Sequence, residues 1–167
     1  MKDTKASKQL RKPKAKPKPK RLTYAQAVKR ADLWFSKLVR YQAADRDGNA
    51  ECFTCKRIAH VSELQAGHFA SRRYHATRWH PDNCRPQCVS CNLYGSGEQW
   101  IFGQHLDGEQ PGRAADIMRA AKHGGKQTVA QLVELASRFK EMALHYTATK
   151  HVDRPAHARR RNREPEA

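Results

Sequence analysis

The spacing of apolar residues predicts two amphipathic helices, one near each end of the chain. In the first helix, over residues 24–43, one face carries Ala27, Ala31, Trp34, Phe35, Leu38 and Tyr41. In the second helix, one face carries Leu132, Leu135, Phe139, Met142 and Tyr146. Thr23 with Gln26, and Thr128 with Gln131, have the spacing of a capping box at the start of each helix. We therefore expect both apolar faces to pack in a core.

The segment after the first helix has shorter apolar runs, which favour strands and loops. Residues 45–48, DRDG, are typical of a turn that ends a helix. Short apolar stretches over residues 51–61 flank a C-x-x-C pair, which favours two short strands joined by a knuckle. Residues 62–87 are polar and rich in His and Arg, so we expect a loop there.

Two further helices are expected before the last one. The first follows Cys91, contains two glycines, and should contribute the apolar residues 100–102, WIF, to the core. The second, within residues 111–125, has Pro near its start and Gly-Gly at its end. Together these elements predict an α+β fold. We expect one domain over residues 22–149, with a small ββα unit flanked by α-helices.

The chain is strongly basic, with a formal net charge of +17, so a polyanion such as DNA is the expected partner. Residues 1–21 hold ten Lys or Arg side chains and one Asp, with repeated Lys-Pro steps and almost no apolar side chains. This composition predicts a disordered basic arm, and residues 150–167 predict a basic tail. The alternative for the arm is a solvated segment with no role in recognition.

The cysteines favour a bound metal over disulfides. No apolar run is long enough for a membrane span or a signal peptide, so we expect a cytoplasmic protein, in which thiols stay reduced. Two C-x-x-C pairs separated by 32 residues supply the four thiolates that a structural zinc prefers: Cys52, Cys55, Cys88 and Cys91.

Two other interpretations of the cysteines remain. A C-x-x-x-C pair of Cys84 with Cys88 would leave Cys91 without a partner, so we expect Cys84 to be a small buried apolar residue. A redox-active pair is the other alternative, but no βαβ pattern surrounds either C-x-x-C pair.

The segment between the two pairs is longer than a zinc knuckle needs, and it carries a pattern of its own. It holds the stretches AGHF and HPDN, and His68, Asn83 and Asn92 follow one another as H-x14-N-x8-N. In these residues the chain resembles the HNH, or ββα-metal, nucleases. Within that group it is most similar to the phage NinG (Rap) recombination proteins, through CFTC, LQAGHF, DNCRPQCVSCN and the SG that follows. The similarity covers about residues 31–104.

This resemblance implies a role for each of the three residues. His68 corresponds to the general base that takes a proton from water. Asn83 corresponds to a residue that orients His68 or the loop around it. Asn92 corresponds to a ligand of a catalytic Mg or Mn ion, for which an amide oxygen is a suitable hard ligand.

One position departs from the pattern of that family. Many HNH enzymes have Asp or His immediately before the base as a second metal ligand, whereas this chain has Gly67. Ser96, Glu98 and the substrate phosphate are the candidates for the missing ligand.

The loop near these residues mixes cations with aromatic rings. The stretch SRRYHATRWH contains Arg72, Arg73, Tyr74, Arg78 and Trp79. Such side chains bind phosphates and stack on exposed bases, which makes them the expected DNA contacts. The alternative is a surface loop that is anchored by its aromatic residues.

The resemblance therefore implies a metal-dependent endonuclease that cuts branched recombination DNA, such as Holliday junctions and D-loops, in the cytoplasm of a bacterial host. It would hold a structural zinc and a catalytic Mg or Mn ion, and paired cuts across a junction favour a homodimer. One rival is a zinc-stapled DNA-binding accessory protein without catalytic activity, which has no need of both His68 and Asn83. Another is an RNA-binding zinc protein, which leaves the H-N-N spacing unexplained.

Overall fold

The computed structural model describes residues 21–152, so most of the predicted basic arm and tail lie outside the described residues. The described part contains two hairpins and four α-helices: α1 (Tyr24–Ala43), β1 (Asn49–Glu51), β2 (Ile58–His60), β3 (Leu64–His68), β4 (Cys84–Cys88), α2 (Gln99–Glu109), α3 (Arg113–Lys122) and α4 (Val129–Thr149). A 3-10 turn (Pro81–Asn83) precedes β4, and a π-helix (Ser90–Tyr94) follows it. The α+β prediction is confirmed. Within residues 21–152, no helix has the length and apolar content of a membrane span.

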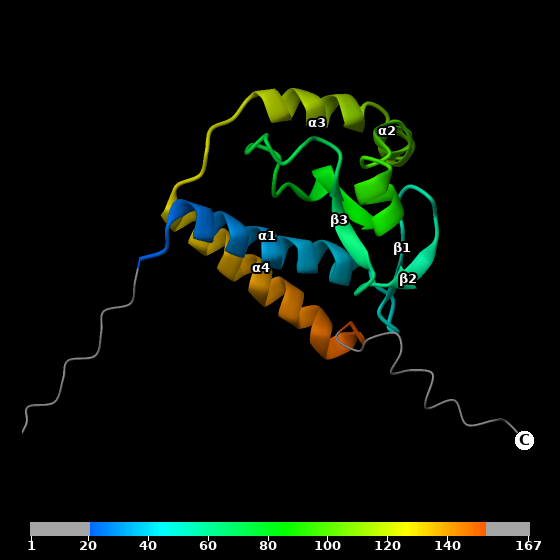
Figure 1. The fold of residues 1–167 in the computed structure, drawn as a ribbon, viewed down its shortest axis with the longest axis horizontal. Helices are drawn as coiled ribbons and strands as arrows, with labels where there is room; N and C mark the ends of the chain where they lie inside the picture. The colour runs from blue at the N-terminus through cyan, green and yellow to red at the C-terminus, as the bar shows by residue number, and fades with distance from the viewer. Residues whose placement is uncertain (1–20, 153–167) are drawn as a thin grey trace, which may run out of the picture.

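Helices α1 and α4 lie side by side and run in the same direction (Figure 1). Both predicted capping boxes are present. The hydroxyl of Thr23 accepts a hydrogen bond from the backbone N–H of Gln26, and Thr128 does the same with Gln131. The predicted bounds of the first helix, 24–43, are confirmed, because the cap and the apolar periodicity act on the same local segment.

The contact between α1 and α4 combines alanines with larger aliphatic and aromatic side chains. Its buried members are Ala27, Ala31, Phe35, Leu132 and Ala136. The ring centroids of Phe35 and Phe139 lie 5.0 Å apart. Met142, which we expected on this face, is 48% exposed, whereas Ala136 and Ala143 are buried. Small side chains at these positions allow the two helices to approach each other closely.

Residues 62–87, predicted to form a loop, contain a second antiparallel hairpin. Strands β3 and β4 pair over five residues, with His68 opposite Cys84, while β1 and β2 form a separate hairpin. The loop prediction is wrong because LQAGH and CRPQC are buried at most positions and so lack the alternation of a half-buried strand. Their positions depend on distant residues, as when the N–H of Phe53 donates to the carbonyl of Pro86.

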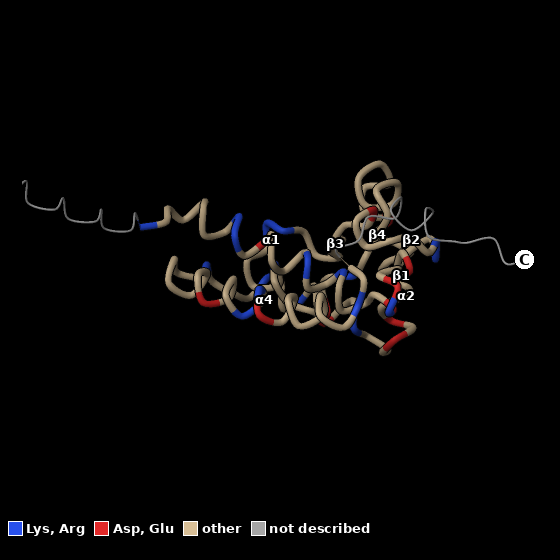
Figure 2. The backbone as a smooth tube through the Cα atoms, turned by 90° about the horizontal axis from the view of Figure 1, so that it is seen from below, with Lys and Arg blue, Asp and Glu red and all other residues tan. Residues whose placement is uncertain are grey.

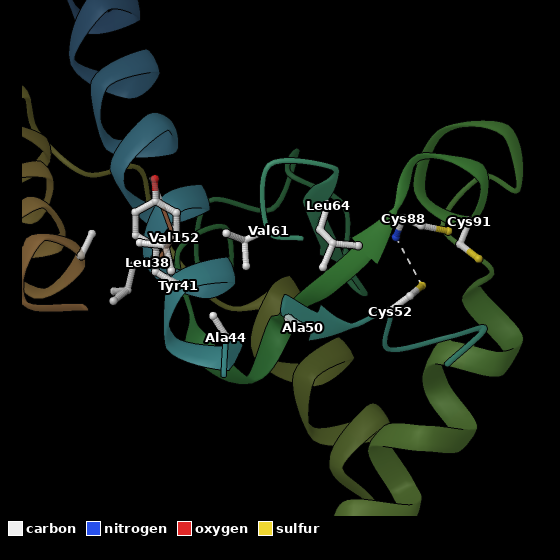
Figure 3. Packing of buried hydrophobic residues seen from close by; sticks show 11 residues of the cluster. Leu38, Tyr41, Ala44, Ala50, Cys52, Val61, Leu64, Cys88, Cys91 and Val152 are labelled. Atoms are coloured by element: carbon white, nitrogen blue, oxygen red, sulfur yellow. Dashed lines mark hydrogen bonds between the residues drawn. The ribbon is translucent and has the colours of Figure 1, made fainter. Parts of the chain in front are cut away.

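The folded part of the chain extends beyond the boundary predicted at residue 149. Val152 is buried in the cluster that includes the end of α1 (Figure 3). The N–H of His151 donates to the carbonyl of Arg46, and Nζ of Lys150 donates to two carbonyls in the last turn of α1. These contacts hold the end of α4 against the end of α1 and the first hairpin.

Helices α2 and α3 form the opposite side of the molecule, and β3 lies between them and the α1–α4 pair (Figure 1). They bury a third apolar cluster, made of Phe53, Ala70, Phe102, Leu106, Ile117 and Ala121. Trp100, which we expected in the core, is 78% exposed, and Ile101 is 37% exposed. Consecutive helical positions point in different directions, so only one of these three neighbours is buried.

Candidate metal centre and adjoining site

Two knuckles that are far apart in the sequence bring four thiols together. Cys52 and Cys55 lie between β1 and β2, Cys88 ends β4, and Cys91 lies in the π-helix. Figure 3 shows Cys52, Cys88 and Cys91. The four Sγ atoms all lie within 4.8 Å of one another, and those of Cys55 and Cys88 are 3.8 Å apart. A tetrahedron with Zn–S bonds of about 2.3 Å has S–S edges of about 3.8 Å. The thiols are therefore positioned to bind a metal ion, and the arrangement is compatible with structural zinc.

The electrostatics of these thiols also suit a cation. Burial raises the pKa of Cys52, but hydrogen bonds from the Thr54 hydroxyl and from backbone N–H groups, that of Cys88 among them, lower it to about 6. Burial, together with the neighbouring thiols, raises the pKa of Cys91 to about 12. Closely packed thiolates repel one another, and a bound dication removes that repulsion.

Cys84 lies outside this group, as predicted. Its side chain is buried in the cluster that contains Phe35 and Trp79. Burial raises the pKa of the Cys84 thiol well above the ordinary value, which opposes formation of a thiolate. Its interpretation as a small buried apolar residue is confirmed.

His68 lies at the end of β3, with a backbone carbonyl oxygen near each of its two ring nitrogens. Its Nε2 lies 2.9 Å from the carbonyl oxygen of Arg78, and its Nδ1 lies 3.3 Å from that of Ala66. Phe35 of α1 lies beside the ring, with 6.4 Å between centroids. Burial lowers the pKa of His68 below its ordinary value, although the hydrogen bond to Arg78 opposes the shift. The imidazole is therefore neutral near neutral pH, which is the form that accepts a proton.

Asn83 is fully buried and holds the loop between β3 and β4. Its Oδ1 accepts from the N–H of Ala70 at 2.6 Å, and its Nδ2 donates to the carbonyls of Ala70 and Thr77, both at 3.0 Å. Thr77 immediately precedes Arg78, whose carbonyl contacts His68. Of the two roles implied for Asn83, the geometry favours orienting the loop over direct contact with the base.

Asn92 lines the same hollow as His68, with a volume of about 570 Å³. Nδ2 of Asn92 donates to Oε1 of Gln65 at 2.5 Å, and Nε2 of Gln99 donates to the backbone carbonyl of His68 at 3.3 Å. Strand β3 and the segment that follows the second knuckle therefore meet at this hollow. Three further residues that the sequence singled out also line it: Arg72, Tyr74 and Ser96.

Gly67 leaves no room for a second metal ligand at its position. A Cβ atom there would overlap the side chain of Gln87, which is fully buried and donates to the carbonyl of Gly97 at 2.9 Å. Glu98, one of the alternative ligands, is not among the residues that line the hollow. Of these two side chains, only Ser96 lines the hollow together with Asn92.

The five predicted DNA contacts divide into exposed and anchored residues. Three are exposed: Arg72, Arg73 and Tyr74. Trp79 is only 8% exposed, and its indole N–H donates to Oδ1 of Asp32 at 2.9 Å. The Trp79 ring packs in the cluster that α1 and α4 share, so little of its surface is open to a base. Arg78 is half-buried and forms an ion pair with the same carboxylate.

Three residues that contact the site were not predicted from the sequence. Asp32 binds Arg78 from 46 positions away, Gln65 binds Asn92 from 27, and Gln99 binds His68 from 31. Apolar periodicity and cysteine spacing carry no information on such polar contacts. The one available signal was the position of Gln65 inside the stretch LQAGHF.

Fold and site together define a small, basic α+β protein in which a four-cysteine centre of the metal-binding type adjoins a hollow lined by a histidine. The family described as bacteriophage lambda NinG protein matches residues 1–146. The chain belongs to this family, which confirms its resemblance to the NinG proteins and indicates a function in phage recombination. Comparisons with curated proteins and with solved structures gave no match.

Proposed function

We propose that this protein is a metal-dependent endonuclease that cuts branched recombination DNA. The observation that carries the proposal is that one hollow is lined by His68 and by Asn92, the residue next to Cys91 of the four-thiol centre. Asn92 follows the ligand-type residue Cys91, so a zinc bound there would also fix the position of the amide. Membership in the NinG family and the net charge of +17 support the proposal.

His68 is the general base in this mechanism. Of the two carbonyl contacts of the ring, that of Nε2 with Arg78 is shorter than that of Nδ1 with Ala66, 2.9 against 3.3 Å, and it favours a ring proton on Nε2, because a carbonyl can only accept. The lone pair on Nδ1 is then available to take a proton from the attacking water. Asn83 is a positioning residue, since it holds the loop that carries Arg78.

Asn92 would hold the catalytic Mg or Mn ion through Oδ1, because its Nδ2 is bound to Gln65. The hydroxyl of Ser96 lines the same hollow and is a second hard oxygen donor. With few protein ligands, the ion would retain water molecules and bind substrate phosphate, as Mg²⁺ usually does. When bound, it supplies positive charge to the phosphate and to the leaving 3′ oxygen.

The surroundings of the hollow suit a DNA strand. Arg72 and Tyr74 line it and Arg73 is exposed beside them, so cations and an aromatic ring lie next to the proposed base. Lys and Arg residues continue along α1, in which Asp32 is the only acidic residue (Figure 2). The preference for branched DNA rests on the family, and paired cuts across a junction would favour a homodimer.

The decisive experiment incubates the zinc-loaded chain with a labelled four-way junction and a matched linear duplex, in Mg, in Mn and in EDTA. We expect cutting of the junction with either metal and none in EDTA. Asn92→Ala should cut slowly and recover in part at high metal concentration, whereas His68→Ala should not recover. Tight binding of the junction without cutting in any metal would favour the DNA-binding accessory protein instead.

A further inference from the structure

Two carbonyl groups compete for the single proton of the neutral His68 ring. The Arg78 carbonyl lies 2.9 Å from Nε2, and the Ala66 carbonyl lies 3.3 Å from Nδ1. Because a carbonyl can only accept, each contact favours a different tautomer. The shorter contact selects the Nε2–H form. If the Arg78 carbonyl moved away, the Ala66 carbonyl would favour Nδ1–H, and the nitrogen proposed to accept the proton would already carry one.

The position of Arg78 depends on helix α1. Asp32 of that helix accepts hydrogen bonds from Nε and Nη2 of Arg78 at 2.9 and 2.6 Å. The same carboxylate accepts from the indole N–H of Trp79 at 2.9 Å. Nη1 of Arg78 also donates to the carbonyl of Arg72 at 2.8 Å, which links two positions of the loop between β3 and β4. One carboxylate therefore anchors two consecutive residues, and one of them provides the carbonyl that binds His68.

This anchor differs from an ordinary surface ion pair. The side chains of Arg78 and Asp32 are 17% and 26% exposed, and the contact is bidentate. The hydrogen bonds to Asp32 raise the pKa of Arg78. Asp32 is itself held in place, because the neighbouring Ala31 and the next turn's Phe35 are both buried in the core.

We propose that Asp32 is a positioning residue for His68: through Arg78, it holds the carbonyl that keeps the ring proton on Nε2 and leaves Nδ1 free to accept a proton. The inference rests on the proposed role of His68 as base, but the tautomer can be measured without any cutting. It also accounts for an acidic side chain beside a DNA-binding site. Asp32 lines a second hollow together with His68 and Arg72, where an unpaired carboxylate would repel phosphates.

The charged groups around His68 determine the conditions of the test. Arg72 lowers the pKa of His68 and Asp32 raises it, in addition to the lowering caused by burial. Removing the Asp32 charge should therefore lower that pKa further. At about pH 8 the ring is neutral in every variant, so a change in its spectrum reports the tautomer and not protonation.

The test uses the full, zinc-loaded chain with ¹⁵N-labelled histidine rings and records long-range ¹H–¹⁵N correlations, with His68→Gln to assign the signals. Wild-type His68 should be mainly the Nε2–H form. Asp32→Asn, which keeps the size of the side chain but removes its charge, should raise the Nδ1–H fraction, and Asp32→Ala should raise it further. Asp116→Asn is the matched control, because it removes an exposed Asp–Arg pair on α3, neither member of which lines a hollow with His68. The control should leave the His68 signals unchanged.

A second variant changes the other partner of the ion pair between Asp32 and Arg78. Arg78→Lys keeps the backbone carbonyl but loses the planar guanidinium, so it should change the tautomer as Asp32→Asn does. Junction cutting should fall about 10- to 100-fold in both variants, because the base is misplaced. Junction affinity in EDTA should not fall in Asp32→Asn. Zinc content and circular dichroism establish that each variant is folded.

The outcomes separate this inference from the proposed function. A wild-type tautomer in folded Asp32→Asn and Arg78→Lys overturns the positioning role, and if Asp32→Asn does not fold, Arg78→Lys alone decides. If the wild-type protein cuts no DNA and both variants still change the tautomer, the nuclease proposal fails while the role of Asp32 stands. If His68 is required for cutting and the tautomer never changes, only the role of Asp32 is rejected.

Discussion

The four-thiol centre and the His68 hollow are adjacent, but they are built in opposite ways. At the centre the functional atoms face one another, with all four Sγ atoms within 4.8 Å. At the hollow each side chain is bound to another part of the protein: His68 to the carbonyl of Arg78 and Asn92 to Gln65. A closed set of four ligands is typical of a structural metal, whereas a catalytic site leaves positions open for substrate and water. We therefore expect the first region to stabilise the fold, and we place the proposed chemistry in the second.

Removing one thiol from the centre should have the largest effect. Cys52→Ser or Cys88→Ser should unfold the central unit and abolish the expected content of about one zinc per chain, because zinc binding contributes on the order of 10 kcal/mol to folding such sites. Circular dichroism and elemental analysis measure both effects. Cys84→Ser is the matched control: it is buried but not a ligand, so it should keep its zinc and cost about 1–3 kcal/mol. Equal zinc loss in Cys84→Ser and Cys88→Ser would contradict the assignment.

Removing the proposed base should have the opposite effect: cutting should be lost, while folding and zinc binding should be retained. His68→Ala should cut the junction about 10²- to 10⁴-fold more slowly while it keeps its zinc and its junction affinity, because the four thiols are untouched. Rate, affinity and zinc are measured on the same preparation. His80→Ala is the control, since His80 is an exposed histidine near the same loop that does not line the hollow. If His68→Ala cuts as fast as the wild type, the nuclease assignment is wrong and the binding module replaces it.

Asn83 tests whether the loop is a structural support for the hollow. Asn83→Ala removes three hydrogen bonds from a fully buried side chain and leaves backbone groups of Ala70 and Thr77 unpaired. We expect a loss of about 3 kcal/mol in the free energy of unfolding, together with slower cutting. Denaturant unfolding at constant zinc measures the first quantity. Wild-type stability would show that the loop is held by other contacts.

The pH dependence of cutting should follow the neutral form of His68. Burial lowers its pKa below the ordinary 6.5, so the rate should remain on its plateau down to that pH and fall only below it. The sign is the same for stability. The contribution of neutral His68 is present above the unfolded pKa and is lost as the pH falls through the lower folded pKa. A pH–rate profile at saturating metal checks this, and a midpoint above 6.5 would contradict the buried environment of the ring.

The basic arm should affect binding more than chemistry. Deleting residues 1–21, most of which lie outside the described part of the chain, should weaken all DNA binding and leave the preference for junctions unchanged. Each phosphate contact that is lost should reduce the log–log salt dependence of affinity by about 0.9. Titrations at several salt concentrations measure the slope. An unchanged slope would mean that the arm does not touch DNA.

The sequence by itself determined the features that depend on local signals. Helix α1 matches its predicted bounds, and both capping boxes form, because a cap and an apolar stripe act within a few residues of each other. The two C-x-x-C pairs identify the thiol centre, because two such pairs in one chain are typical of a structural zinc site and of few other kinds of site. Cys84 is excluded by the same spacing, and its burial follows from the apolar character of a free thiol.

The tertiary structure alone decided what surrounds His68. The β3–β4 hairpin has no periodic signal, since its strands are short and buried at most positions. Trp79 and Trp100 are chemically alike, yet the first is buried beside Asp32 and the second is exposed. Asp32 meets Arg78 across 46 positions only because α1 packs against β3 and β4. Local sequence patterns indicate which secondary structure and burial a residue prefers. These contacts, in contrast, form only when the packing of the helices brings polar groups from distant parts of the chain together.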